Sequence, residues 1–241
     1  MVGIGPGGRQ DRTHRAERAI ACADVILGYR PYLELIADLT AGKDLRPSGM
    51  RQEVARVDEA LDEACAGRRV VLVSSGDAGI YGMAGVALER AHERNLTVPI
   101  ETVAGVTASS AAAALLGAPL MLDFVTLSLS DLLVPWDTIV RRLELAAEAD
   151  FVIALYNPRS RTRTTQFSEA RAILLRHRSP STPVGLARGM GHVDESHRLT
   201  TLGDLKEEEV DMRTIVIVGN STTRSTSHRM FTPRGYFKRE P

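Results

Sequence analysis

The run Val70–Ser74 limits how this chain can fold more than any other feature. It reads Val-Val-Leu-Val-Ser, carries no charge, and leads directly into a glycine-rich loop. A continuous β-branched run of this length is typical of a strand buried on both faces, and such strands belong to parallel sheets covered by helices. The run therefore predicts an α/β protein.

Strand-like and helix-like segments alternate along the whole chain, as expected of mostly parallel sheets. We expect strands at residues 2–4, 25–28, 70–74, 99–103, 124–128, 151–156, 183–187 and 214–218. We expect helices near residues 13–23, 51–66, 84–94, 105–119, 137–149 and 165–177. A turn near residues 116–119 predicts two α/β lobes, residues 1–115 and 116–241, rather than one continuous sheet.

Charge and cysteine content exclude several classes of protein. Thirty Lys and Arg are balanced by thirty Asp and Glu, so the bulk electrostatics of a nucleic-acid-binding protein are missing. Cys22 and Cys65 are too few for a disulfide framework or a metal knuckle, and we expect both thiols to be buried. The six histidines show no ligand spacing, so we expect no metal site and no nucleic-acid partner.

One segment has the length of a membrane span. Residues 102–122 contain no charged residue, but they are rich in Ala, Gly, Ser and Thr and are interrupted by Gly117 and Pro119. Such residues supply little free energy of transfer into hydrocarbon, which favours a buried helix over a membrane span. The N-terminus lacks a basic flank followed by an apolar stretch, so we expect no secretory signal and a cytoplasmic protein.

The first glycine loop matches a dinucleotide-binding pattern only superficially. Gly3, Gly5 and Gly8 satisfy GxGxxG after a predicted strand. However, a polar loop follows where a helix should begin, and the second strand runs into Tyr29 and Arg30 without the expected acidic residue. A dinucleotide-dependent oxidoreductase is therefore the alternative from a different class, and it is disfavoured.

The second glycine loop is more informative because it follows the buried strand Val70–Ser74. Gly76, Gly79 and Gly82 allow the backbone to approach a ligand closely. Asp77 lies where open α/β sheets bind small molecules, at the carboxyl end of a parallel strand. The plain alternative is a strand-to-helix turn in which Asp77 caps the next helix.

Several motifs, in order along the chain, resemble those of the tetrapyrrole (corrin/porphyrin) methylases. They are GIGPGG at residue 3, SSGDAGIYGMAG at residue 74, GVTASSAAAALLGAPL at residue 105, LSLSDLLVPW at residue 127, ADFVIALYNPRS at residue 149, VIVGNSTTRS at residue 216 and MFTPRGY at residue 230. The GPG and GDxGxYG loops are shared across that family. The motifs SLSDLL, LYNPRS and TPRGY are narrower, and point to methylation at C-17 of a precorrin.

The resemblance implies a two-lobed fold with the active-site cleft between two α/β domains, a homodimer, and S-adenosylmethionine as cofactor. It implies methyl transfer to C-17 of precorrin-3B or its cobalt-chelated counterpart with ring contraction to the precorrin-4 form, in cobalamin biosynthesis. Methylation at another precorrin position is the alternative within the family. Carried over by motif, the cofactor-binding residues are Pro6, Ser75, Gly76, Asp77, Ile80, Thr107, Ala108, Asn157, Ala187 and Gly189.

The substrate and the reaction suggest further candidates. A tetrapyrrole carries many carboxylates, and Arg159, Arg161 and Arg163 follow the predicted strand end at Tyr156-Asn157-Pro158. Guanidinium groups match carboxylates well, so these arginines are candidate substrate contacts, with a solvated basic loop as the alternative. Ring contraction also needs proton transfer, for which Asp131 and Tyr29 are catalytic candidates. A helix N-cap is the alternative role for Asp131.

Overall fold

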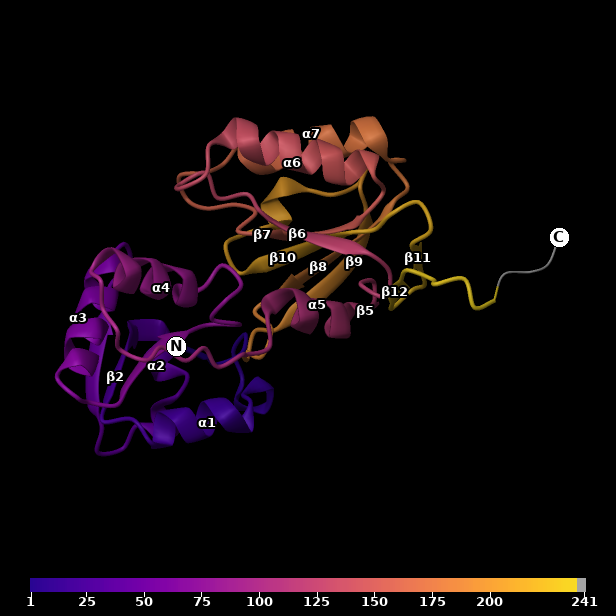
Figure 1. Ribbon diagram of the computed structural model, residues 1–241. Coiled ribbons are helices and arrows are strands. Elements are labelled where there is room, and N and C mark those ends of the chain that lie inside the picture. Colours follow the sequence, from indigo (N-terminus) through magenta and orange to yellow (C-terminus); the bar gives the residue numbers. More distant parts are fainter. Residues whose placement is uncertain (238–241) are drawn as a thin grey trace. The chain divides into compact units, whose positions relative to one another are not determined.

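The first compact unit contains a sheet of four parallel strands in the order β1-β4-β2-β3. These are β1 (Val2–Gly3), β2 (Val25–Tyr29), β3 (Asp44–Ser48) and β4 (Val70–Ser74). The computed structural model describes residues 1–237 (Figure 1), and the chain divides into two units, Met1–Ala108 and Ser109–Pro241. The predicted strand at residues 70–74 is confirmed, and it lies between β1 and β2 with parallel neighbours on both sides.

Helices cover both faces of this sheet because alternate strand residues point to opposite sides. They are α1 (His14–Ala21), α2 (Arg30–Glu34), α3 (Glu53–Cys65) and α4 (Met83–Glu93), with short 3-10 helices η1 (Arg9–Asp11) and η2 (Ala37–Leu39). Leu72 packs with apolar residues of α3 and α4. Val71 and Val73 pack on the other side with α1, through residues such as Ile20.

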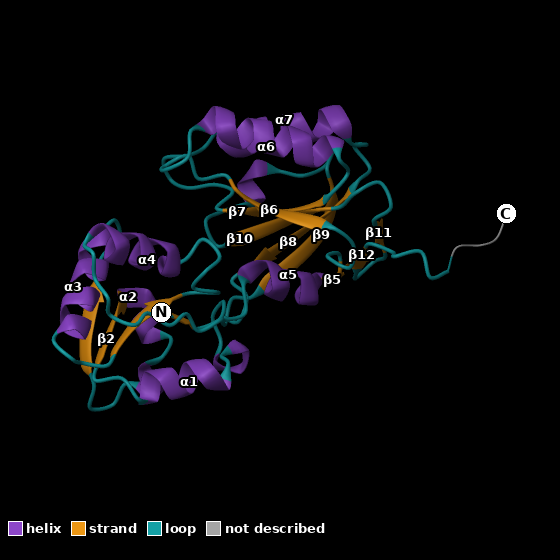
Figure 2. Cartoon of the chain, viewed as in Figure 1, coloured by secondary structure: helices purple, strands orange, loops and turns teal. Residues whose placement is uncertain are grey.

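The second unit contains a five-stranded mixed sheet in the order β6-β7-β10-β8-β9 (Figure 2). Its strands are β6 (Phe124–Ser128), β7 (Val152–Tyr156), β8 (Pro183–Arg188), β9 (Ser196–Thr201) and β10 (Thr214–Val218). Only β6 and β7 are parallel. The expectation of mostly parallel sheets is therefore wrong for this unit, because β10 runs antiparallel between β7 and β8, and β9 returns antiparallel beside β8.

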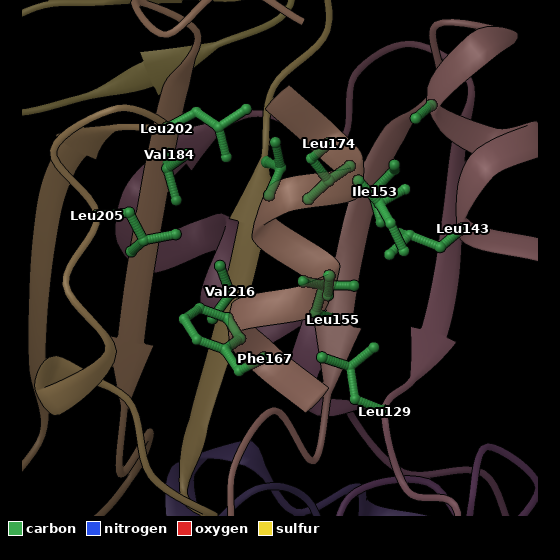
Figure 3. Packing of buried hydrophobic residues seen from close by; sticks show 14 of the residues in the cluster. Leu129, Leu143, Ile153, Leu155, Phe167, Leu174, Val184, Leu202, Leu205 and Val216 are labelled. Atoms are coloured by element: carbon green, nitrogen blue, oxygen red, sulfur yellow. The ribbon is translucent and has the colours of Figure 1, made fainter. Parts of the chain in front are cut away.

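Helices α6 (Trp136–Glu148) and α7 (Gln166–His177) lie on one side of this sheet, and α5 (Ala108–Leu116) lies on the other (Figure 1). A core of Leu143, Ile153, Leu155, Phe167 and Leu174 fills the space under α6 and α7 (Figure 3). A small sheet of β5 (Gly117–Ala118), β11 (Arg224–Ser225) and β12 (Met230–Phe231) follows α5, and η3 (Glu207–Glu209) precedes β10.

Within the segment 105–119, the helix α5 covers only Ala108–Leu116, and β5 (Gly117–Ala118) follows it. Within residues 1–237, no helix is both long enough and apolar enough to cross a bilayer. Helix α5 lies against β8, since a Cβ placed on Gly185 would meet the Leu116 side chain at 2.5 Å. This packing accounts for a division of the units at residues 108/109, earlier than the boundary expected from sequence at 115/116.

Two sequence expectations are wrong in the first unit. Residues 99–103 form no strand, and only an isolated bridge between Val2 and Val103 is present there. Cys22 and Cys65 are both exposed. Cys22 is the C-cap of α1 and Cys65 is the last residue of α3, so each lies in a closing turn outside the buried stripe of its helix.

Candidate functional site

Two glycines join the loops that follow β1 and β4. The Gly5 N–H donates to the Gly76 carbonyl at 3.1 Å, and the Gly76 N–H donates to the Gly5 carbonyl at 2.7 Å. Both residues have positive φ, +81° for Gly5 and +63° for Gly76, a region that favours glycine. The two glycine motifs of the sequence are thus held side by side at the carboxyl edge of the first sheet.

Asp77 fastens a third segment to this edge. Its Oδ1 accepts the Gly79 N–H at 2.8 Å, and its Oδ2 accepts the Gly105 N–H at 2.9 Å. Asp77 is not the N-cap of α4, a position that Gly82 occupies. Loops 3–8, 75–82 and 104–108 therefore form one hydrogen-bonded surface, which we call the three-loop edge.

The glycines of this edge differ in how closely other atoms pack against them. A Cβ on Gly105 would lie 2.2 Å from the Gly76 carbonyl oxygen, whereas a Cβ on Gly76 would lie 3.8–3.9 Å from the backbone of residues 106–108. Gly105 is therefore packed against its neighbours, whereas a Cβ on Gly76 would make only ordinary van der Waals contacts with the backbone of residues 106–108. The edge is thus lined by backbone groups and small side chains.

The remaining first-unit candidates flank this edge. Pro6 is half-buried in the first loop, and Ile80 is exposed in the second. Ser75 precedes Gly76 in the second loop, and the Tyr32 ring packs edge-on against Tyr29 at 5.2 Å between centroids. Burial raises the pKa of the Tyr32 hydroxyl. Tyr29, a candidate for proton transfer, thus lies at the end of β2 beside Tyr32.

The first loop does not have the form of a dinucleotide site. η1 (Arg9–Asp11) follows the glycines, and α1 begins only at His14. A dinucleotide-binding loop opens directly into a helix whose N-terminus receives the pyrophosphate. The polar segment between Gly8 and His14 separates the glycines from α1, as the sequence indicates.

In the second unit, Asn157 has a strained backbone at the end of β7. Its φ is +48°, a region that non-glycine residues seldom adopt and that clusters at functional sites. Its Nδ2 donates to the Ser128 Oγ at 3.0 Å, and its carbonyl accepts from the Arg163 guanidinium at 2.5 Å. Strand ends β6 and β7 and the following loop therefore hold Asn157 from three sides.

Tyr156 has a role that the sequence analysis did not find. Its buried hydroxyl accepts the Ser109 N–H at 2.9 Å, in the first turn of α5. This bond ties the first turn of α5 to the residue preceding Asn157. The available signal was a lone hydroxyl on the otherwise apolar strand β7, within the motif LYNP.

Ala187 and Gly189 mark the end of β8. Ala187 is buried and pairs with Ile215 of β10. Gly189 has φ +61°, and a Cβ there would lie 2.9 Å from the Arg213 guanidinium. Arg213 forms a bidentate pair with Asp194, both contacts 2.7 Å, which closes the loop between β8 and β9.

The three arginines after β7 have different surroundings. Arg159 donates to the Glu207 carbonyl at 3.0 Å, and Arg163 donates to the Asn157 carbonyl. Burial lowers the pKa of Arg163, and nearby Asp131 opposes that shift. Arg161 is exposed, with no hydrogen bond or ion pair to any described residue. It is the arginine of this group whose guanidinium is available to a ligand.

Asp131 is exposed in the loop after β6. Its Oδ2 accepts from the Gln166 Nε2 at 2.8 Å, at the start of α7. It does not cap α6, whose N-cap is Pro135. The alternative role as a helix cap is therefore wrong.

The candidates thus form two groups, one in each unit, and the members of each group lie near one end of that unit's strands. Pro6, Ser75, Gly76, Asp77, Ile80, Thr107 and Ala108 belong to the three-loop edge, and Tyr29 lies beside it. Asn157, Gly189, Arg161 and Asp131 follow strands of the second sheet, and Ala187 lies in the last two residues of β8. Across the described residues, no group of three or more His, Cys, Asp or Glu is arranged to hold a metal ion.

Known proteins resemble this chain along nearly its whole length. A family model described as Tetrapyrrole (Corrin/Porphyrin) Methylases matches residues 1–206. A probable cobalt-factor III C(17)-methyltransferase of Salmonella typhimurium is 48% identical and covers 98% of both chains. The crystal structure of the methyltransferase CobJ has a TM-score of 0.91 at 39% identity, covering 96% of this chain and 98% of that one.

A more distant structure carries a bound nucleoside. It is a uroporphyrin-III C-methyl transferase from Thermus thermophilus complexed with S-adenyl homocysteine, with a TM-score of 0.66 at 23% identity. It covers 90% of this chain and 95% of its own. At this identity the likeness concerns the fold.

Proposed function

The chain belongs to the tetrapyrrole (corrin/porphyrin) methylases, and on that premise we propose that it transfers a methyl group from S-adenosylmethionine to C-17 of a precorrin-3-stage ring and contracts the macrocycle. This is a step of cobalamin biosynthesis. The single observation that supports it most is the 48% identity, over 98% of both chains, to a relative named for C(17) methylation. The relative's name makes the cobalt-chelated ring the first substrate to test and precorrin-3B the second.

The three-loop edge supports S-adenosylmethionine as the cofactor. Gly76 lies against the backbone of residues 106–108, where side chains are small, and Ile80 of the second loop has an exposed apolar side chain. When bound, the cofactor supplies an electrophilic methyl group on a sulfonium. Methyl transfer of this kind depends on positioning and exclusion of water more than on a nucleophilic side chain. Loops of Gly, Ala and Thr held by hydrogen bonds suit that requirement.

The polar candidates account for substrate binding and proton transfer. Arg161 binds a carboxylate of the ring, because its guanidinium is exposed and without a partner among the described residues. Asn157 presents its amide at a backbone position held by Ser128 and Arg163. Tyr29 and Asp131 are the candidates for moving the proton that ring contraction requires. We further propose a cytoplasmic homodimer, and sedimentation velocity of the purified protein tests the dimer.

The experiment that tests this function is an anaerobic incubation of the purified protein with each ring and with S-adenosylmethionine carrying a 13C-labelled methyl group. Mass spectrometry should show one added methyl group, and NMR should place the label at C-17 of a contracted ring. A label at another carbon would support methylation at a different position. Failure of both rings to accept label, in protein that binds S-adenosylhomocysteine, would refute the proposed substrate.

A further inference from the structure

Arg56 is a buried cation for which the described part of the chain provides no carboxylate. It lies in the first turn of α3, with 4% of its surface exposed. Its hydrogen bond goes to the Gly49 carbonyl at 3.4 Å, the long limit for such a contact. Its Nε is buried without a partner. Among residues 1–237, no Asp or Glu lies within ion-pair distance of it.

The Nε atoms of Arg12 and Arg178 are also buried without a partner, but the rest of each guanidinium has a carboxylate nearby. Arg12 forms a bidentate pair with Asp38 at 2.8 and 2.6 Å. Arg178 donates to the Gly219 and Phe151 carbonyls and lies 3.6 Å from Asp150. Removing a charge from water without such partners costs several kcal/mol. Arg56 is therefore the exception that needs an explanation.

The position of Arg56 adds to the cost. The N-terminus of a helix carries a partial positive charge, so a cation in the first turn is unfavourable and an anion is favourable. Gln52, the N-cap of α3, makes no side-chain cap, because its Oε1 accepts the Gly49 N–H at 2.6 Å instead. An anion beside Arg56 would be stabilised both by the guanidinium and by this helix end.

The neighbours of Arg56 belong to the ligand edge of the sheet. Gly49 follows β3, Tyr32 lies beyond the end of β2, and Ser75 follows β4. Burial raises the pKa of the Tyr32 hydroxyl, and the positive charge of Arg56 opposes that rise. The hydrogen bond from Arg56 to the Gly49 carbonyl places the guanidinium at the turn that follows β3. In α/β sheets with parallel strands, ligands gather at this carboxyl edge.

We propose that Arg56, together with the N-terminal end of α3, binds a carboxylate group of a ligand that occupies the carboxyl edge of the first sheet. A guanidinium offers a fork of N–H donors that matches a carboxylate, and its unpartnered Nε is one of them. The identity of the ligand rests on the proposed function. It is either a carboxylate of the tetrapyrrole or the methionyl carboxylate of the cofactor.

The test compares two buried arginines. Arg56→Met removes a cation that this chain leaves unpaired, so the thermal midpoint should be unchanged or higher. Arg178→Met removes a cation that the chain satisfies, so the midpoint should fall. Arg56→Met should bind a carboxylate ligand at least tenfold more weakly, whereas Arg178→Met should bind it as the wild type does. Affinity should thus fall only in Arg56→Met, and stability should fall only in Arg178→Met.

Calorimetric titrations with three probes identify the source of the carboxylate. They are uroporphyrin, a tetrapyrrole bearing carboxylates; S-adenosylhomocysteine; and 5′-methylthioadenosine, which lacks the amino-acid carboxylate. Weaker binding of uroporphyrin alone assigns Arg56 to the ring. Weaker binding of S-adenosylhomocysteine with unchanged binding of 5′-methylthioadenosine assigns it to the cofactor. Both results support the proposal.

Wild-type affinity of Arg56→Met for uroporphyrin and for S-adenosylhomocysteine would overturn the proposal. So would equal weakening of S-adenosylhomocysteine and 5′-methylthioadenosine, since the latter has no carboxylate. If Arg56→Met does not fold, Arg56→Gln, which keeps a donor for the Gly49 carbonyl, decides the same comparison. These readouts are binding constants, so they are separate from the turnover assay that tests the proposed function.

Discussion

Gly105 is the position at which the smallest substitution should have the largest effect on the ligand edge. In Gly105→Ala, the added Cβ would lie 2.2 Å from the Gly76 carbonyl oxygen and 2.8 Å from both the carbonyl carbon and the oxygen of Gly3. Ordinary contacts are about 3.5 Å or more. Because all the opposing atoms are backbone, residues 104–108 must move away by about 1 Å.

The free-energy change has two parts. Overpacking against well-ordered backbone costs about 1–3 kcal/mol. Moving Gly105 also weakens its hydrogen bond to the Asp77 carboxylate, 2.9 Å and partly buried, at about 1 kcal/mol. We therefore expect a total of about 2–4 kcal/mol, which lowers the melting temperature of the first unit by on the order of 10 °C. Affinity for S-adenosylhomocysteine should fall at least tenfold, since Thr107 and Ala108 move with Gly105.

Gly85→Ala is the matched control. Gly85 lies exposed in α4, and no atom lies within 4 Å of a Cβ placed there. Alanine is favoured over glycine inside a helix by about 0.5–1 kcal/mol, so this variant should be slightly stabilised with unchanged affinity. Urea unfolding followed by circular dichroism and calorimetric titration with S-adenosylhomocysteine measure both quantities. Wild-type stability and affinity in Gly105→Ala would refute the close packing of the three loops.

Other predictions use the same assays. Gly76→Ala, at φ +63°, should cost about 1 kcal/mol of stability and weaken S-adenosylhomocysteine binding; unchanged affinity would separate this loop from the cofactor. Tyr156→Phe leaves the Ser109 N–H without its acceptor and should cost about 1–3 kcal/mol by urea unfolding, and an unchanged midpoint would contradict the bond. Arg161→Ala should weaken uroporphyrin binding about fivefold at low salt and less at high salt, leaving S-adenosylhomocysteine binding intact; equal effects on both ligands would argue against a substrate role. Hydrogen bonding to Arg213 lowers the pKa of Asp194 to about 2, below its unfolded value, so its stabilising effect is present above about pH 4 and is lost toward pH 2. The protection factors of amides in residues 189–195, which correct for the intrinsic exchange rate at each pH, should fall over that interval, and Asp194→Asn should remove this acid dependence.

The sequence predicts those elements in which the pattern of apolar residues is clear. Residues 70–74 and 214–218 are buried runs rich in Val and Ile, and residues 124–128 are a half-exposed run with the same kind of pattern; each forms a strand with those bounds. It misses β3 and β9, which read DLRPS and SHRLTT. Both lie at sheet edges with exposed side chains, so no apolar pattern marks them. Pairing with a neighbouring strand, which is a tertiary effect, decides their conformation.

The direction of the strands in the second sheet could not be read from local patterns. A five-residue apolar run predicts burial on both faces, and β10 is buried throughout. Burial does not determine whether its neighbours run parallel or antiparallel. That choice depends on the placement of β10 between β7 and β8, which joins segments far apart in the chain.

The candidate site shows a similar division. Motifs identified the loops, because glycine at Gly5 and Gly76 is required by positive φ. They did not identify the positioning roles of Gly105 or Tyr156. Each of these depends on a partner at a distance along the sequence, such as Gly76 for Gly105 or Ser109 for Tyr156. Such partners become visible only in the fold.

The surroundings of Asp77 bear on how a loop of this kind recognises a ligand. A carboxylate after a parallel strand suggests a direct ligand contact, yet each oxygen of Asp77 accepts a backbone N–H of this chain. A carboxylate used in this way fixes the relative positions of loops 75–82 and 104–108. We therefore expect the proposed cofactor to be recognised mainly by backbone groups of these loops, and backbone groups reach a ligand only where side chains are absent or small. Because both oxygens of Asp77 are used within the chain, the loops must present their backbone instead, and this requires glycine at residue 76 and small side chains at residues 107 and 108.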